Sequence, residues 1–173
     1  ATPRALEQRV GPADVDVWNH MNNARYFRKL EQGRLDFFAG TGLYAALLRL
    51  QIGVGIGSVV TRFRRELAPF QRYALVTRLA GWDDRSFFLE HRMVVGGFVH
   101  AVSVSKAVLK RGSKHSPTDV LRMLEPGFVE ATLANGGASS SWYANDGVKA
   151  FADFERASSI CLRSSAAERG GGG

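Results

Sequence analysis

The sequence predicts an α+β domain in which a curved antiparallel sheet wraps around one long helix. Three observations lead to this prediction: hydrophobic residues at helical spacing near the start of the chain, four later segments rich in β-forming residues, and short turn sequences between those segments. Short connections favour antiparallel pairing of consecutive strands. Because such a sheet must bury one face, the early helix is its natural cover.

The first part of the chain predicts one strand followed by the long helix. Residues 4–10 form the expected strand, and a loop rich in Gly, Pro and Asp follows it. The helix is expected from about Asn22, and Gly40 and Gly42 are expected to end it. Gly33 lowers helix propensity, but it allows a covering strand to approach closely. The residues at helical spacing are Phe27, Leu30, Arg34 and Phe38.

Four strands are predicted after the helix, each bounded by turn-forming residues. They are expected at residues 53–67, 72–82, 87–95 and 98–110. In the first of these strands, Val59, Thr61 and Phe63 share one face. The pair Gly96-Gly97 predicts a hairpin turn between the last two strands.

The character of the sequence changes after Arg111. We therefore predict a domain over residues 1–111 and a C-terminal extension over residues 112–173, with one or two helices and a Gly/Ser-rich tail. A helix start is expected at Ser116 and a second helix within residues 142–159. The linker at residues 135–141 and the tail from Glu168 are expected to be flexible.

The formal net charge of +7 and the pI near 10.1 favour acidic partners. Nucleic acid, an anionic membrane surface and a phosphate-bearing substrate such as coenzyme A all fit, as does an ordinary solvated basic surface. Because no RNA-binding signature is present, we expect no sequence-specific nucleic acid partner. The single cysteine, Cys161, excludes an intramolecular disulfide, so an oxidising compartment is not required.

The sequence contains few features that would direct the protein to a membrane or an organelle. No segment has the length and apolar character of a transmembrane helix, and we expect none. The chain starts at Ala1 instead of a methionine, which fits either removal of an organellar targeting peptide or trimming. We therefore expect a mitochondrial or a cytoplasmic location.

The segment with the clearest chemistry lies in the loop before the long helix and runs into its first turn. It reads Asp14-Val15-Asp16-Val17-Trp18-Asn19-His20-Met21-Asn22-Asn23-Ala24-Arg25-Tyr26. Asp16 lies just ahead of the helix, where unpaired N–H groups of the first turn point toward the same space. A carboxylate beside such donors suits thioester hydrolysis. Asp, Asn and His before a helix are also ordinary capping and turn residues, so this reading stays open.

This segment resembles the D-x-D-x-x-x-H-[VM]-N-N-x-x-Y signature of hotdog-fold thioesterases of the acyl-CoA thioesterase superfamily. The signature occurs in the 4-hydroxybenzoyl-CoA thioesterase-like branch and in plant acyl-ACP thioesterases. Residues 58–67 and 81–90 are similar to strands of the eukaryotic thioesterase superfamily member proteins. The resemblance covers residues 4–111 and implies a hotdog fold.

The resemblance also implies roles for individual residues. Asp16 takes the place of the catalytic aspartate, and the backbone N–H near Asn23 polarises the thioester carbonyl. His20 orients the carboxylate or the attacking water. The positions that the resemblance assigns to substrate binding are Asp14, Asn22, Tyr26, Arg62 and Arg64. A partner chain completes the site, and neither a cofactor nor a metal ion is expected.

One position departs from the acyl-ACP branch of the family. An asparagine lies two residues after the second aspartate in those enzymes, whereas Trp18 stands there in this chain. We expect a bulky indole at this place to narrow or to fill the acyl path.

Two functions from different classes follow. The first is hydrolysis of acyl-CoA or acyl carrier protein thioesters by a homodimer or a larger hotdog-type oligomer. The second is a catalytically silent accessory subunit of a larger mitochondrial complex, which a membrane-associated assembly would also fit. A fold alone does not decide between these functions.

Overall fold

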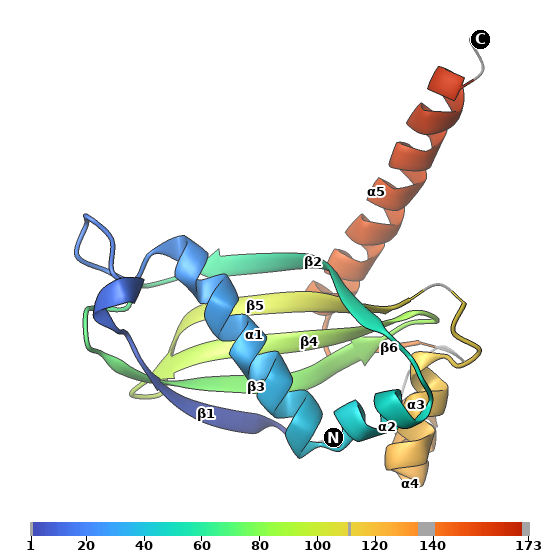
Figure 1. Ribbon diagram of the computed structural model, residues 1–173, viewed down its shortest axis with the longest axis horizontal. Coiled ribbons are helices and arrows are strands. Elements are labelled where there is room, and N and C mark those ends of the chain that lie inside the picture. Colours follow the sequence, from blue (N-terminus) through green and yellow to red (C-terminus); the bar gives the residue numbers. More distant parts are fainter. Residues whose placement is uncertain (1, 111, 135–140, 171–173) are drawn as a thin grey trace.

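The computed structural model describes residues 2–110, 112–134 and 141–170, and these residues form a six-stranded antiparallel sheet with helices on both of its faces (Figure 1). The strands are β1 (Arg4–Arg9), β2 (Val54–Phe63), β3 (Arg72–Trp82), β4 (Ser86–Val95), β5 (Phe98–Leu109) and β6 (Trp142–Tyr143). The helices are the short 3-10 helix η1 (Pro12–Asp14) and the α-helices α1 (Asn23–Gly40), α2 (Leu43–Arg49), α3 (Pro117–Leu124), α4 (Pro126–Ala134) and α5 (Asp146–Gly170).

The strand order is β1-β3-β4-β5-β2, and β6 pairs with β3. β1 pairs with β3 from Arg72 to Thr77, and β6 takes up the same edge further along, at Gly81 and Trp82. The pair Gly96-Gly97 lies in the turn between β4 and β5, with φ angles of 53° and 82° that favour glycine. The predicted hotdog arrangement, a curved antiparallel sheet around one long helix, is confirmed.

α1 lies across the concave face of the sheet (Figure 1). It buries Tyr26, Leu30, Gly33 and Phe37 on one side, as its helical spacing predicts. Gly33 allows the closest approach, because a Cβ atom at this position would lie 2.7 Å from Thr77 Oγ1 and 2.9 Å from Leu75 Cδ2. The sequence-based interpretation of Gly33 is therefore confirmed.

A small polar network crosses the concave face beneath α1. The His91 ring is 1% exposed and is hydrogen-bonded on both sides, by Nδ1 to Thr77 Oγ1 at 3.0 Å and by Nε2 to Ser105 Oγ at 2.9 Å. These bonds satisfy both ring nitrogens, as a buried imidazole requires.

The C-terminal extension covers the opposite face of the sheet. Val148 and Ala152 of α5 pack against Ala80 and Phe88. Trp142 of β6 stacks near Trp82, with 5.3 Å between the ring centroids. From this contact α5 continues away from the body of the molecule (Figure 1). The extension is thus joined to the sheet by strand pairing as well as by helix packing.

Several details differ from the sequence-based expectation. α2 was not predicted, and the extension has three helices in its described residues where one or two were expected. The expected helix at residues 142–159 starts only at Asp146, after β6, and it continues to Gly170, beyond the predicted start of the tail at Glu168. Residues 135–140 of the predicted linker and residues 171–173 of the predicted tail lie outside the described residues. Within the part of the chain that the structure describes, no helix has the length and apolar character needed to span a bilayer.

Candidate active site

The loop between η1 and α1 forms a narrow projection at one end of the molecule (Figure 1). Its base is closed by a bridge between Val15 and Met21, and the Asp16 N–H donates to the His20 carbonyl at 3.0 Å. Asn19 has a φ of 61°, a conformation that asparagine tolerates better than most residues. The loop is therefore a defined turn, and it holds Asp16 directly ahead of α1.

The Asp16 carboxylate contacts three groups of its own loop. Oδ1 accepts a hydrogen bond from the Trp18 N–H at 3.0 Å. Oδ2 lies 3.5 Å from His20 Nδ1 and 3.5 Å from Asn22 Nδ2. The Asp16 side chain is 16% exposed, so the carboxylate is held in place but remains accessible from solvent.

The first turn of α1 presents a hydrogen-bond donor beside this loop. Asn22 caps the helix, because its side chain accepts from the Ala24 N–H at 2.9 Å and its carbonyl accepts from the Arg25 N–H at 2.9 Å. Among the described residues, the N–H of Asn23 has no hydrogen-bond partner. This donor and the positive end of the helix favour a negatively charged oxygen at this point.

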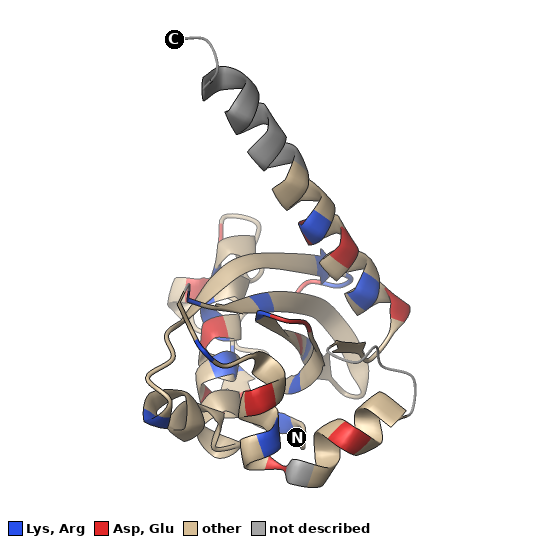
Figure 2. Ribbon diagram, turned by 90° about the vertical axis from the view of Figure 1, so that its right-hand side faces the viewer, with Lys and Arg blue, Asp and Glu red and all other residues tan. Residues whose placement is uncertain are grey.

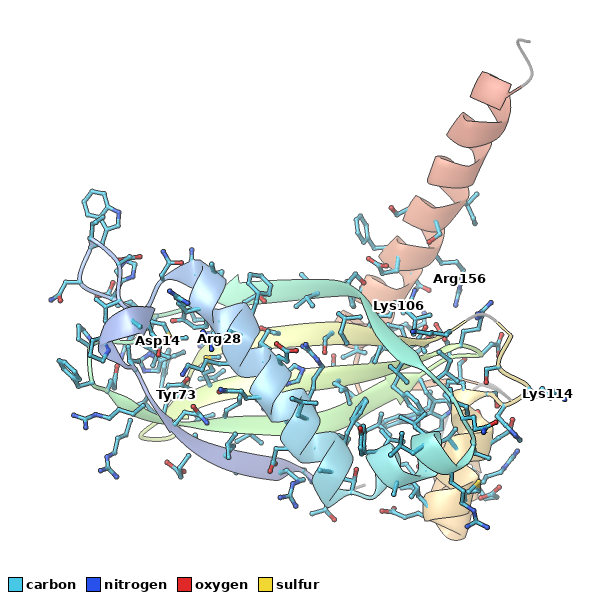
Figure 3. All side chains as sticks on the ribbon, viewed as in Figure 1. Asp14, Arg28, Tyr73, Lys106, Lys114 and Arg156 are labelled. Atoms are coloured by element: carbon cyan, nitrogen blue, oxygen red, sulfur yellow. The ribbon has the colours of Figure 1, made fainter. Side chains whose placement is uncertain are left out.

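Asp14 interacts with the fold around the loop. Its carboxylate accepts from the Gly11 N–H at 3.0 Å and lies 3.2 Å from Lys29 Nζ. Burial alone would raise the pKa of Asp14, but the Gly11 hydrogen bond and the Lys29 ammonium outweigh it and hold the pKa below its ordinary value. Figure 3 shows Asp14 with Arg28 and Tyr73 at the end of the molecule that carries the loop. Asp14 thus anchors the loop onto α1.

The other predicted substrate-binding residues lie apart from the Asp16 carboxylate. Tyr26 is 2% exposed and packs edge-on against Phe63, with 4.9 Å between ring centroids. Arg62 and Arg64 are exposed, and Arg64 Nη1 donates to the Val99 carbonyl at 3.2 Å. Within the described residues, neither arginine forms a hydrogen bond or ion pair with Asp16. The structure brings together Asp16, His20 and Asn22, and Asn23 follows directly as the first residue of α1.

Trp18 helps to position the Asp16 carboxylate through its backbone, which the sequence did not indicate. Its backbone N–H holds Asp16, whereas its indole is 78% exposed. The expectation that this indole narrows or fills the acyl path stays a prediction, because a partner chain is expected to complete the site and the indole is exposed on one protomer. The motif gives no sign of this exposure.

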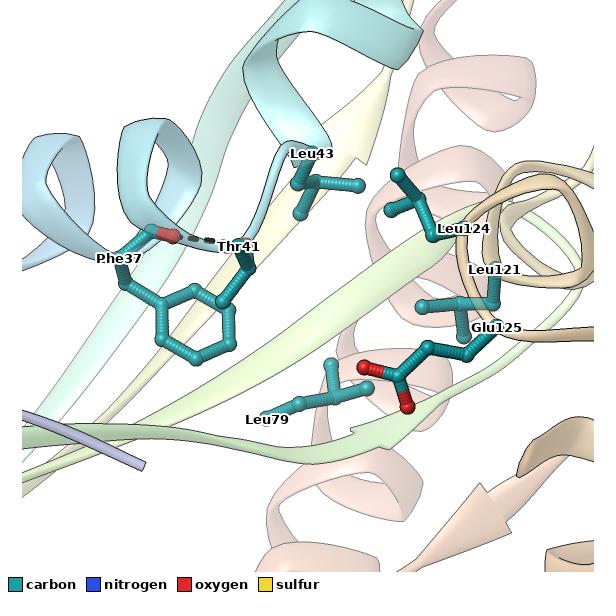
Figure 4. Close-up of a pocket in the computed structure, with 7 residues that line it drawn as sticks. All are labelled: Phe37, Thr41, Leu43, Leu79, Leu121, Leu124 and Glu125. Atoms are coloured by element: carbon teal, nitrogen blue, oxygen red, sulfur yellow. Dashed lines mark hydrogen bonds between the residues drawn. The ribbon is translucent and has the colours of Figure 1, made fainter. Parts of the chain in front are cut away.

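Two concave regions border α1 further from the loop. A pocket at its C-terminal end is lined by Phe37, Thr41 and Leu43 with residues of β3, α3 and the segment after α3 (Figure 4). Its volume of about 10 Å³ is the space of a single water molecule. Since α1 has 18 residues, this end lies about 27 Å along the helix from the Asp16 loop. The pocket is a packing gap between helices.

The second region is a groove of about 390 Å³ between α1, α2 and the edge strand β2. Apolar side chains dominate its lining, with Arg34 and Glu31 as its charged members. Its apolar residues include Leu35, Phe38, Leu47, Leu48 and Ile56. This groove has the size and character of a site for an apolar group.

Comparison with known families agrees with this architecture. Residues 10–128 match the family model of the Thioesterase-like superfamily, and the chain belongs to this superfamily. Protein THEM6 of Drosophila melanogaster is 42% identical over 96 residues, which cover 54% of this chain and 50% of the relative. The chain spans about half the length of the curated relatives it matches. The predicted resemblance to eukaryotic thioesterase superfamily members is confirmed.

Solved structures show the same fold. The probable thioesterase YbaW from Escherichia coli aligns with a TM-score of 0.64 at 21% identity, covering 72% of this chain and 98% of that chain. A 4-hydroxybenzoyl CoA thioesterase mutant in complex with 4-hydroxybenzoyl CoA aligns with a TM-score of 0.60 at 17% identity, covering 72% of this chain and 100% of that chain. At these identities the likeness establishes the hotdog fold.

Proposed function

We propose that this chain hydrolyses acyl-CoA thioesters, with Asp16 as the general base or the nucleophile. One observation carries the proposal: a positioned, accessible carboxylate lies in the loop directly before α1, and the first N–H of that helix, at Asn23, has no partner among the described residues. Membership of the Thioesterase-like superfamily supports the same reaction class. Hydrolysis of a thioester needs both an activated oxygen nucleophile and a donor for the developing oxyanion.

The reaction can proceed in either of two ways. As a base, Asp16 takes a proton from a water molecule while the water oxygen attacks the thioester carbonyl. The C–S bond of the tetrahedral intermediate then breaks, and the departing coenzyme A thiolate takes up the proton that Asp16 holds. As a nucleophile, its carboxylate oxygen attacks the carbonyl itself, the coenzyme A thiolate leaves, and water then hydrolyses the mixed anhydride. In both cases the carbonyl oxygen gains negative charge, and the Asn23 N–H at the positive end of α1 stabilises it. The products are a carboxylic acid and the free thiol.

Three neighbours of Asp16 act as positioning residues in this scheme. The Trp18 N–H fixes Oδ1, while His20 and Asn22 lie on the side of Oδ2. This leaves a defined orientation of the carboxylate toward the start of the helix. His20 is also placed to orient the attacking water, because its Nδ1 lies beside the Asp16 oxygen.

The groove between α1, α2 and β2 is the proposed location of the acyl chain. It is mainly apolar and follows α1 away from the Asp16 loop. Arg62 and Arg64 are exposed cations that we assign to the phosphates of the substrate. The structural neighbour that contains 4-hydroxybenzoyl CoA supports coenzyme A as the carrier. An acyl carrier protein is the alternative carrier, because its phosphopantetheine would present the same thioester.

We also propose that a second copy of the chain covers this groove. β2 lies at the open edge of the sheet and, in the described residues, pairs with β5 alone. Exposed apolar side chains follow this edge, with Ile56 43%, Val60 47% and Phe63 42% exposed. An unprotected apolar edge strand is a site for pairing with another strand. Pairing two β2 strands would enclose the groove beside α1.

The test is acyl-CoA hydrolysis by the purified protein over short, long and aromatic acyl groups. Replacement Asp16→Asn should lower kcat/KM by about 10²–10⁴-fold, the usual scale for an acid–base group. The matched control is Asp153→Asn on exposed α5, which should keep full activity. Wild-type turnover in Asp16→Asn would reject the role of this carboxylate. A folded wild-type protein without turnover on any thioester would favour the accessory-subunit function, and its partners would then be sought.

A further inference from the structure

We propose that the end of the molecule that carries the Asp16 loop docks on anionic lipid bilayers. In this arrangement Val17 and Trp18 enter the interfacial region of the bilayer, and the surrounding arginines contact lipid phosphates. This inference goes beyond thioester hydrolysis and does not depend on it.

The first observation is the exposure of two apolar side chains at the tip of the loop. Val17 is 91% exposed and Trp18 is 78% exposed. Side chains of this kind are costly to leave in water, and adjacent ones at a projecting tip mark an interaction site more clearly than scattered ones. Neither side chain belongs to a hydrophobic core cluster of the described residues.

The second observation is that the tip is firmly held. The Val15–Met21 bridge closes its base, and the Met21 N–H donates to the Leu67 carbonyl at 2.9 Å, which joins the loop to the segment after β2. The Trp18 N–H is hydrogen-bonded to Asp16. A preorganised tip loses little conformational entropy when it enters another phase.

The third observation is the positive charge around the tip. Residues 9–29 and 62–72 contain eight Lys or Arg and three Asp or Glu, and therefore carry +5 of the +7 formal charge of the chain. Hydrogen bonds bring these two segments together, because Arg9 Nε donates to the Phe70 carbonyl at 2.9 Å and Val10 pairs with Phe70 and Gln71. Figure 3 places Arg28 at this end and Lys114 at the opposite end.

Aromatic side chains lie among these cations. Phe70 is 53% exposed, with the Arg9 guanidinium 5.3 Å from its ring centre. The guanidinium groups of Arg64 and Arg65 lie 4.7 and 4.5 Å from the ring centre of Phe98. Aromatic residues interspersed with arginines suit the headgroup region, where rings lie at the boundary and cations meet phosphates.

A lipid surface fits these observations better than a nucleic acid or a protein. Tryptophan favours the membrane interface, because its ring is apolar while its N–H needs a polar partner. A projecting aliphatic and aromatic tip has no role in contacts to a phosphate backbone. The surface of α5 differs from the surface around the loop, where positive charges are in excess. Its exposed turns alternate in charge (Figure 2), and Asp153 pairs with Lys149 and Arg156.

The chain contains its own reporter for the test. Among its three tryptophans, Trp82 is fully buried and Trp142 is partly buried against it, whereas Trp18 is exposed. The difference between wild-type and Trp18→Phe emission therefore isolates Trp18. We expect this difference spectrum to shift to the blue with phosphatidylcholine vesicles that contain phosphatidylserine, but not with pure phosphatidylcholine. Brominated lipids should quench it.

Vesicle co-sedimentation measures how much the apolar tip and the arginines each contribute to lipid binding. The pair Val17→Ser/Trp18→Ser and the pair Arg64→Glu/Arg65→Glu should each weaken binding about tenfold or more. The control variants change exposed residues elsewhere: Met123→Ser/Phe154→Ser on α3 and α5, and Lys149→Glu/Arg156→Glu on α5. These controls should bind like wild type.

Two results would overturn the proposal. Binding that depends on the arginines but survives loss of Val17 and Trp18 would be surface electrostatics without insertion. A Trp18 emission already blue-shifted without vesicles, which turns red on dilution, would show that the tip is buried in a protein–protein contact. Neither result would bear on Asp16, because thioester turnover is measured separately.

Discussion

His91 lies at the centre of the concave face, hydrogen-bonded to Thr77 and Ser105. Burial lowers its pKa to about 3, and the nearby Arg34 adds to this shift while Glu90 opposes it. A neutral imidazole is therefore part of the folded core. The hydroxyl groups on both sides complete the hydrogen bonding of this neutral form.

The lowered pKa of His91 makes stability depend on pH. Between pH 6.5, the ordinary value, and about pH 3 the unfolded chain binds a proton that the folded chain rejects. The free energy of unfolding should therefore fall as the pH falls through this window, with a contribution approaching about 1.4 kcal/mol per pH unit. Urea unfolding at several pH values measures this slope. His91→Gln should reduce the slope, whereas His115→Gln at an exposed site should leave it unchanged. Equal slopes in both variants would contradict the assignment.

The residues of the candidate site were predictable only where they are local in sequence. Asp16, His20 and Asn22 meet because one turn and one helix cap place them, and both can be inferred from residue types. The placement of Tyr26 depends on packing against Phe63, a residue 37 positions later. The exposure of Trp18 depends on a left-handed residue at Asn19, which asparagine permits but does not dictate.

At the scale of elements, the contact between α1 and β3 depends on Gly33. A methyl group there would lie 2.9 Å from Leu75 Cδ2 and 2.7 Å from Thr77 Oγ1, so Gly33→Ala must push the helix from the sheet. We expect a loss of about 1–3 kcal/mol in unfolding free energy, although alanine has the higher helix propensity. Urea unfolding checks this value. Gly127→Ala in α4 is the control, because nothing lies within 4 Å of its Cβ position. Equal stability of the two variants would reject this account.

Helices and strands were predictable from the sequence when they were long enough to show a regular spacing of apolar residues. α1 and the strands β2 to β5 show clear periodicity, and the structure contains them within a few residues of the expected bounds. α2 has 7 residues and β6 has 2, too few for periodicity to appear. β6 exists because its backbone pairs with Gly81 and Trp82, and such long-range pairing leaves little local signal.

At the scale of the whole molecule, the open edge at β2 predicts self-association. Sedimentation velocity should detect a dimer of the wild-type protein. The double variant Ile56→Lys/Val60→Lys should raise the dissociation constant of this dimer at least about tenfold, because lysine on an edge strand opposes pairing. Met123→Lys on α3 is the control, since this side chain is 45% exposed and lies away from β2. A wild-type protein that is monomeric at all concentrations would exclude the proposed enclosure of the groove.

The packing of the C-terminal extension against the sheet affects how the chain folds during its synthesis. Phe88 and Ala80 are covered by Val148 and Ala152, which are synthesised about sixty residues later. At about 5–20 residues per second, this apolar face stays open for about 3–13 s after Phe88 has left the ribosome. During that interval the nascent chain presents an apolar sheet surface, and exposed surface of this kind makes a folding intermediate prone to aggregation. Substitutions that slow the docking of α5 would therefore reduce the yield of native protein in cells more than its equilibrium stability would suggest.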